Sequence, residues 1–145
     1  PKHGYQLFAH AGQRWQDKER RESKSNSIQV LKISLHERRM KLALILSTNN
    51  AETNWNAFRL ANIALDKGDA VTVFLLGDGV EYGMNTSGQF DIQSQVKKFL
   101  QSEGTIIACG TCMALRHKKD SKTCPEGGIQ DLYNLVADYD KILTF

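Results

Sequence analysis

From Met40 onward, the apolar positions of the chain predict alternating β-strands and α-helices. Short apolar runs with the length of buried parallel strands cover residues 41–47, 70–76, 105–108 and 141–145. Between them, apolar residues at helical spacing predict helices over about 53–67, 91–103, 113–118 and 129–136. The segment 120–128 has room for one short edge strand. This alternation is typical of an α/β fold with a mainly parallel sheet of about five strands, covered by helices on both faces.

The first 39 residues lack this regular pattern. Residues 13–26 are almost entirely polar, and Trp15 is their one large apolar side chain. Such a segment buries too little surface to offset the entropy of ordering. Because Met40 directly precedes the first strand, we expect it to be the first residue of the domain. The predicted organisation is a polar, basic N-terminal extension (1–39) outside the core fold and an α/β domain (40–145).

A functional basic arm is the alternative for this extension. Cations surround the aromatic Trp15 there, and such interleaving occurs in nucleic-acid-binding segments. These cations are Arg14, Lys18, Arg20 and Arg21.

The net charge of +3 is unevenly distributed along the 145 residues. Residues 1–39 contain 9 Lys and Arg against 4 Asp and Glu, whereas residues 40–145 contain 10 against 12. The predicted domain is therefore slightly acidic, and we do not expect it to bind nucleic acid directly. The sequence contains neither a run of about 18 apolar residues nor a recognisable signal peptide, so we expect no membrane association and a cytoplasmic protein.

In open parallel sheets the functional site lies at the carboxyl ends of the strands. Three predicted loops qualify, namely 47–50, 77–83 and 109–112. They make Asn49, Asp78 and Glu81 candidates for lining the site. A carboxylate close to a thiol would raise its pKa or accept its proton. The chain has no G-x-G-x-x-G or P-loop motif, so the Gly77-Asp78-Gly79 sequence predicts a tight turn.

The cysteines carry the strongest chemical signal in the domain. Cys109 stands where a strand passes into a helix, and there the free N–H groups of a helix N-terminus lower the pKa of a thiol. Cys112 lies one turn further and can face the same site. Arg116 and the cations after it, up to Lys119, are positioned to support a thiolate or to attract an acidic partner.

Four interpretations of these cysteines compete. The first is structural, since free cysteines are often small buried apolar residues. The second is a zinc site, because the side-chain types are suitable in Cys109, Cys112, His117 and Cys124. The third is a thioredoxin-type dithiol, although its C-x-x-C motif comes late in the domain and Pro125 is poorly placed for the facing cis-proline. The fourth is a persulfide carrier, in which Cys109 holds a sulfane sulfur.

Several blocks of the sequence together resemble the DsrE/DsrF-like family, which includes YchN-like and TusD-like sulfur-relay proteins. Residues 56–61 (NAFRLA) and 67–80 (KGDAVTVFLLGDGV) are similar to its first helix and second strand. Residues 104–112 (GTIIACGTC) with Ala114, Leu115 and Arg116 resemble its cysteine strand and helix, and 140–145 (DKILTF) its closing strand. The resemblance covers residues 40–145, and it rests on the order and spacing of the blocks.

This resemblance implies a three-layer α/β/α fold, assembly into homo-trimers or homo-hexamers, and an active cysteine at the position of Cys109. The implied activity is that of a small sulfur carrier or sulfurtransferase, which exchanges persulfide sulfur with donor and acceptor proteins. Cys112 would then resolve the persulfide by forming a disulfide, or only shield it. Loops 48–53 and 79–89, and a neighbouring subunit, would complete the site. We expect neither a cofactor nor a metal.

Two further functions remain open at this point. The chain could serve as a non-catalytic oligomeric binding or regulatory subunit with inert cysteines. It could also be a C-x-x-C dithiol redox protein.

Overall fold

The computed structural model describes residues 39–84, 86, 88–119 and 122–145. They form a five-stranded sheet in which every strand pair is parallel, with the order β4-β3-β2-β1-β5. The strands are β1 (Lys41–Leu46), β2 (Ala70–Leu75), β3 (Thr105–Cys109), β4 (Glu126–Gly127) and β5 (Lys141–Thr144). The helices are α2 (Ala51–Asp66), the 3-10 helix η1 (Gly77–Glu81), α3 (Ile92–Gln101), α4 (Gly110–Leu115) and α5 (Ile129–Asp138). The predicted α/β class is confirmed, including the short edge strand.

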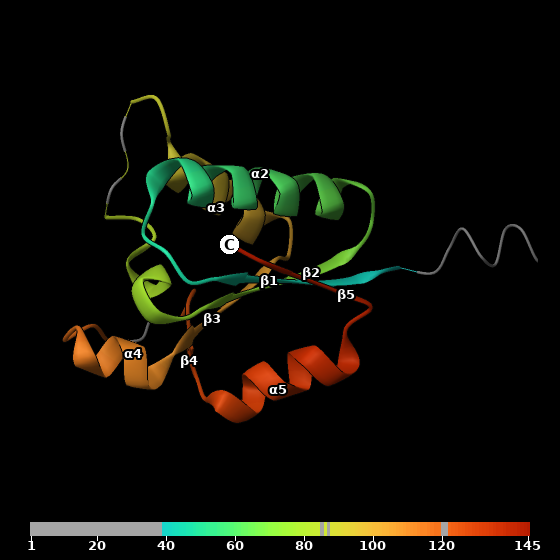
Figure 1. Cartoon of the computed structure of the whole chain (residues 1–145). Helices are drawn as coiled ribbons and strands as arrows, with labels where there is room; N and C mark the ends of the chain where they lie inside the picture. Colours follow the sequence, from blue (N-terminus) through green and yellow to red (C-terminus); the bar gives the residue numbers. More distant parts are fainter. Residues whose placement is uncertain (1–38, 85, 87, 120–121) are drawn as a thin grey trace, which may run out of the picture. The chain divides into compact units, whose positions relative to one another are not determined.

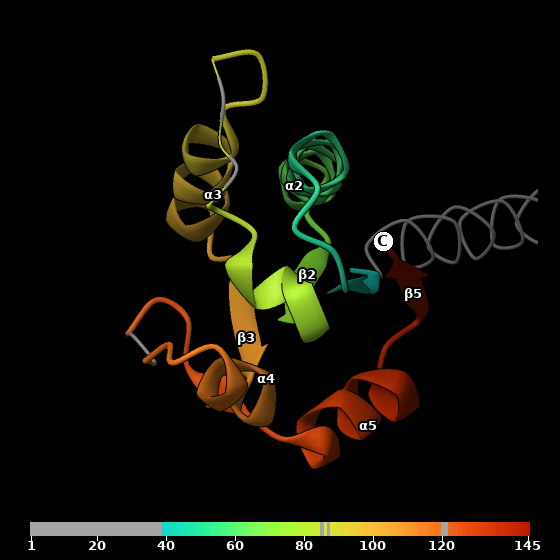
Figure 2. The same cartoon turned by 60° about the vertical axis from the view of Figure 1, so that its left-hand side comes forward.

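The helices lie on both faces of the sheet and make three layers (Figure 1). Helices α2 and α3 cover one face, and α4 and α5 lie on the opposite side (Figures 1 and 2). Alternate residues of each strand point to opposite faces, so the strands supply two separate apolar clusters. The larger cluster lies under α2 and α3 and contains Phe58 and Phe99, both fully buried. The smaller lies under α5, with Ala43, Phe74 and Leu135 as its buried members.

Side-chain caps decide where two of the helices begin. The Asn50 side chain accepts a hydrogen bond from Thr53 N at 2.9 Å, so α2 begins at Ala51 instead of about residue 53. Asp91 caps α3 in the same way through Ser94 N. Helix α4 differs most from the prediction, since it runs over Gly110–Leu115 instead of 113–118. It ends before His117, whose φ of 52° lies in the left-handed region.

The composition of the Gly77-Asp78-Gly79 segment predicted a tight turn. In the structure this segment instead begins the 3-10 helix η1. This helix packs directly against the end of β1. A Cβ atom on Gly79 would clash with the carbonyl oxygen of Leu46, so only glycine fits there. Glycine therefore lets η1 lie close to the carboxyl edge of the sheet, where the predicted site residues gather.

Residues 1–38 lie outside the described residues, so the predicted N-terminal extension and the boundary at Met40 stay predictions. Among the residues that the structure describes, no helix is both long and apolar enough to cross a membrane.

Candidate functional site

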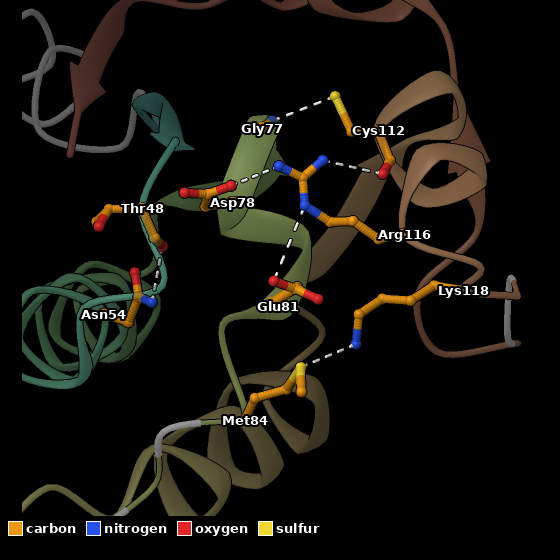
Figure 3. A network of polar contacts seen from close by, with 9 residues as sticks. All are labelled: Thr48, Asn54, Gly77, Asp78, Glu81, Met84, Cys112, Arg116 and Lys118. Atoms are coloured by element: carbon orange, nitrogen blue, oxygen red, sulfur yellow. Dashed lines mark hydrogen bonds and ion pairs between the residues drawn. The ribbon is translucent and has the colours of Figure 1, made fainter.

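The candidate site lies where η1 and α4 face each other, after the ends of β2 and β3. We call this region the η1–α4 seam and define it by residues 77–81 and 109–116. The seam includes both ends of the C-x-x-C motif and three of the predicted site-lining residues. Figure 3 shows the polar contacts that cross it. The sheet edge thus brings together segments more than 30 positions apart in the sequence.

Cys112 points across the seam toward η1. Its sulfur accepts a hydrogen bond from the backbone N–H of Gly77 at 3.2 Å (Figure 3). The side chain is half-buried and packs against the larger apolar cluster. This contact holds the Cys112 side chain against the start of η1.

Cys109 has different surroundings. It is the last residue of β3 and the N-cap of α4, and its side chain packs against the smaller apolar cluster. Burial, followed by a hydrogen bond with the Cys112 side chain, raises the pKa of the Cys109 thiol above its ordinary value. The prediction of a lowered pKa is therefore wrong.

The helix N-terminus does not reverse this effect. The N–H groups of Cys112 and Thr111 act in the opposite direction and lower the pKa of Cys109, although neither makes a capping hydrogen bond of ordinary geometry. Helix α4 has only six residues, so its aligned peptide dipoles are few. Burial of the Cys109 thiolate has the larger effect, so the pKa of Cys109 is raised.

Arg116 is the central cation of the seam. Its guanidinium donates to the Asp78 carboxylate, lies 3.8 Å from a Glu81 carboxylate oxygen, and donates to the Cys112 carbonyl at 3.2 Å (Figure 3). The Asp78 carboxylate raises the pKa of Arg116 further. Arg116 thus joins α4 to η1, and its charge is shared with two carboxylates instead of being reserved for a cysteine.

Asn49 lies on the β1–α2 loop and is half-buried. Its role in the site stays a prediction.

The potential zinc ligands do not assemble. Cys109 and Cys112 are neighbours, but Cys124 packs at the larger apolar cluster, and burial raises the pKa of its thiol. No three His, Cys, Asp or Glu side chains form a possible metal-binding group in the described part of the chain. The structure therefore gives the zinc alternative no support.

Three features of the seam were missed by sequence reasoning. The first is the backbone N–H of Gly77, which donates to the Cys112 sulfur; a pattern of side chains cannot predict a backbone donor. The Glu126 side chain lies directly over Gly110, where a Cβ would require this flexible side chain to move. Lys118 contacts the Met84 sulfur at 3.5 Å beside the seam (Figure 3). The run of cations up to Lys119 was the one signal that pointed toward this region.

Two adjoining pockets lie beside the seam and share Val80, Tyr82 and Lys118. The larger, of about 550 Å³, extends along α3 to Leu100. The smaller, of about 240 Å³, reaches Cys124. Neither Cys109 nor Cys112 is among the residues that line these two pockets.

Comparison with solved structures finds the same α/β fold in other proteins. The chain is similar to the ychN protein from E. coli, with 21% identity and a TM-score of 0.62 over 74% of this chain and 99% of that one. It is also similar to BT1422, described as a conserved protein of unknown function from Bacteroides thetaiotaomicron, with 24% identity and a TM-score of 0.61 over 72% and 94% of the two chains. No curated protein sequence matches the chain.

The family comparison covers most of the chain. The model of the DsrE/DsrF-like family matches residues 40–145, which include every described strand and helix. The resemblance carried by the sequence blocks is thereby confirmed. The chain belongs to the DsrE/DsrF-like family.

Proposed function

We propose that this protein is a sulfur carrier that holds sulfane sulfur as a persulfide on Cys109. Its family is generally related to sulfur relay. The observation that carries the proposal is the pair of free thiols at the carboxyl edge of the parallel sheet, with Cys109 at the end of β3 and Cys112 in the first turn of α4. That edge is where functional groups gather in open α/β folds.

The proposed chemistry is thiol–persulfide exchange. The Cys109 sulfur attacks the outer sulfur of a donor persulfide, R–S–SH, and the donor leaves as its thiolate. The Cys109 persulfide then gives the same sulfur to the thiolate of an acceptor, and Cys109 becomes a thiolate again. Each step exchanges one sulfur–sulfur bond for another, so neither requires an outside oxidant or reductant.

The other site residues have distinct proposed roles. Arg116 fixes α4 against η1 through Asp78 and Glu81, which holds Cys112 beside Gly77. Asn49 would line the approach from the β1–α2 loop. The loops 48–53 and 79–89, with a neighbouring subunit, would complete the shallow site. These roles require no cofactor or metal.

We further propose a homo-oligomer, a trimer or hexamer, that works in the cytoplasm with protein donors and acceptors. Its support is the outer face of α5, which exposes Ile129 (79%), Tyr133 (64%) and Val136 (55%). These three residues follow helical spacing and form one apolar stripe. An apolar stripe of this kind on a well-packed domain is typical of a protein–protein contact.

Mass spectrometry of the purified protein after incubation with a protein or small-molecule persulfide tests the carrier function. We expect an increase of about 32 Da, one sulfur atom, on the peptide that contains Cys109. The Cys109→Ser variant should lose the adduct, whereas Cys124→Ser, the matched control, should keep it. An adduct that persists in Cys109→Ser, or no adduct in the unmodified protein, contradicts the proposal.

A dithiol redox protein is the second candidate, and the C-x-x-C spacing of the two free cysteines favours it. This function requires a reversible Cys109–Cys112 disulfide, with a loss of about 2 Da, in glutathione redox buffers. A stable disulfide without any persulfide adduct would favour it over the carrier. If both are absent, the non-catalytic oligomeric subunit becomes the better description.

A further inference from the structure

The two pockets beside the seam are a feature that the proposed sulfur chemistry does not use. They adjoin at Val80, Tyr82 and Lys118, which line both of them. The larger pocket alone measures about 550 Å³, which is within the range of pockets that bind small molecules. Neither Cys109 nor Cys112 is among their described lining residues, so a ligand in these pockets would be separate from sulfur transfer.

One wall of the larger pocket is a single side of helix α3. The α3 residues that line it are Gln93, Val96, Lys97 and Leu100. They follow the i, i+3, i+4 and i+7 spacing of neighbours on a helix surface. At about 1.5 Å per residue, this side of α3 extends over about 10 Å. Val96 and Leu100 make it apolar along much of that length, which suits an elongated apolar group.

The ring of Tyr82 adds to the apolar lining. It packs against the buried Phe58 ring with 5.6 Å between the centroids, so the larger cluster holds it in place. The buried Val80 of η1 also lines the pocket. The apolar lining is therefore anchored in the core, and a ligand does not have to order it.

The charged side chains around the two pockets are mostly cationic. Lys97 lines the larger pocket, Lys119 lines the smaller one, and Lys118 lines both. Among the described lining residues the one carboxylate is Glu81, which lies 3.8 Å from the Arg116 guanidinium and shares its charge with that cation. Three lysines around an apolar pocket attract an anion.

Lys118 is the cation best placed to hold an anion where the pockets meet. It is half-buried, and its ammonium contacts the Met84 sulfur at 3.5 Å (Figure 3). A thioether is a weak hydrogen-bond acceptor, whereas a carboxylate is a strong one for an ammonium group. Met84 is 67% exposed, so it can move aside when a carboxylate takes over this contact.

We propose that these pockets bind a small free organic acid, with its apolar body along α3 and its carboxylate at Lys118. Three observations carry this assignment: the apolar side of α3, the excess of lysines, and the weak acceptor that the Lys118 ammonium now contacts. A cation with the same apolar body would meet repulsion from the lysines. The site does not depend on the carrier function, since it uses neither cysteine of the C-x-x-C motif.

Calorimetric titration of the full chain with octanoate tests the class of ligand. We expect octanoate to bind, and octylammonium, which has the same alkyl chain and the opposite charge, to bind at least about tenfold more weakly. From hexanoate to decanoate, the affinity should rise about two- to fourfold for each added methylene that is buried. Absent binding of octanoate, equal affinity for octylammonium, or an affinity independent of chain length overturns the proposal.

Two lysine variants locate the carboxylate. Lys118→Gln removes the proposed cation and should weaken octanoate binding about five- to tenfold. Lys98→Gln is the matched control, because Lys98 pairs with Asp66 at 2.8 Å and is not among the residues that line either pocket. We expect its affinity to change by less than about twofold. Unchanged affinity in Lys118→Gln, or an equal loss in both variants, contradicts the placement.

Lysine acetylation of the unmodified protein tests the same placement without any substitution. A carboxylate bound at Lys118 stabilises the charged ammonium, which does not react with an acylating reagent. Saturating octanoate should therefore slow acetylation of Lys118 at least about threefold, measured by mass spectrometry of its peptide, and leave Lys98 unchanged. Absent protection of Lys118, or equal protection of both lysines, overturns the proposal.

Discussion

The two faces of the sheet are covered very differently. The face under α2 and α3 carries the larger cluster, in which the Phe58 ring packs against the rings of Phe99 and Tyr82 with centroid distances of 5.7 and 5.6 Å. Among the described residues, the face under α5 buries three in its cluster, Ala43, Phe74 and Leu135. Both sides expose some apolar side chains, Leu60 and Ile63 on α2 and a longer stripe on α5, so the two faces differ mainly in what they bury.

This difference also separates the two cysteines. Cys112 packs against the larger cluster and Cys109 against the smaller one. The face under α2 and α3, called the thick face below, buries the larger cluster, and the face under α5, called the thin face below, buries the smaller one beside Cys109. The comparison therefore assigns stability mainly to one side of the sheet, whereas the proposed subunit contact would use the other.

The largest expected effect is on the thick face. Phe58→Ala removes a fully buried ring and should lower the free energy of unfolding by about 3–5 kcal/mol, because the cavity cannot collapse within a packed aromatic group. Denaturant unfolding followed by circular dichroism measures this change. The matched control is Ile63→Ala on the same helix, at a residue 55% exposed, with an expected effect below about 1 kcal/mol.

On the thin face, Leu135→Ala should cost less than Phe58→Ala, about 2–3 kcal/mol, since half-buried neighbours can close around the smaller side chain. A cost equal to or above that of Phe58→Ala would contradict the difference between the two faces.

A smaller change in the free energy of unfolding is expected at alkaline pH. Burial raises the pKa values of Tyr82 and Cys124, which lie at the thick face, and of Cys109 at the thin one. Because the folded state binds these protons more tightly, their stabilisation is complete below the ordinary thiol pKa of 9.0 and is lost as pH rises through the raised values.

Thermal or denaturant unfolding between about pH 7 and 10.5 checks this decline. Cys124→Ser should flatten the decline in part, since it removes one of the buried groups. Stability that increases over this range would reverse the sign and contradict the pKa directions.

The smallest effect on stability is expected at the α5 stripe. Tyr133→Glu changes a residue that is 64% exposed and should alter the free energy of unfolding by no more than about 0.5 kcal/mol. If α5 is the subunit contact, the same change should convert the oligomer to a monomer in size-exclusion chromatography with light scattering. Gln130→Glu, which adds the same charge at another exposed α5 position, should leave the oligomer intact.

Several elements were predictable because their cause is local. The apolar runs of β1 and β2 and the helical spacing of α2 specify buried strands and an amphipathic helix without any distant contact. Helix α4 was misplaced, since its start depends on Cys109 as N-cap and its end on the left-handed backbone of His117. The Gly77–Glu81 segment was also mispredicted, because its 3-10 helix depends on packing against Leu46.

The candidate site likewise has features that depend on the local sequence and features that depend on distant contacts. The sequence by itself determined the family resemblance, the alternation of strands and helices, and the adjacency of Cys109 and Cys112, all of which depend on order and spacing along the chain. Only the tertiary structure decided the environment of each sulfur. Gly77 donates to Cys112 from 35 positions away, Arg116 engages Asp78 from 38 positions away, and the small cluster desolvates Cys109. A thiol's pKa depends on the donors, charges and apolar groups around it, and these are brought together only when the sheet aligns the ends of its strands.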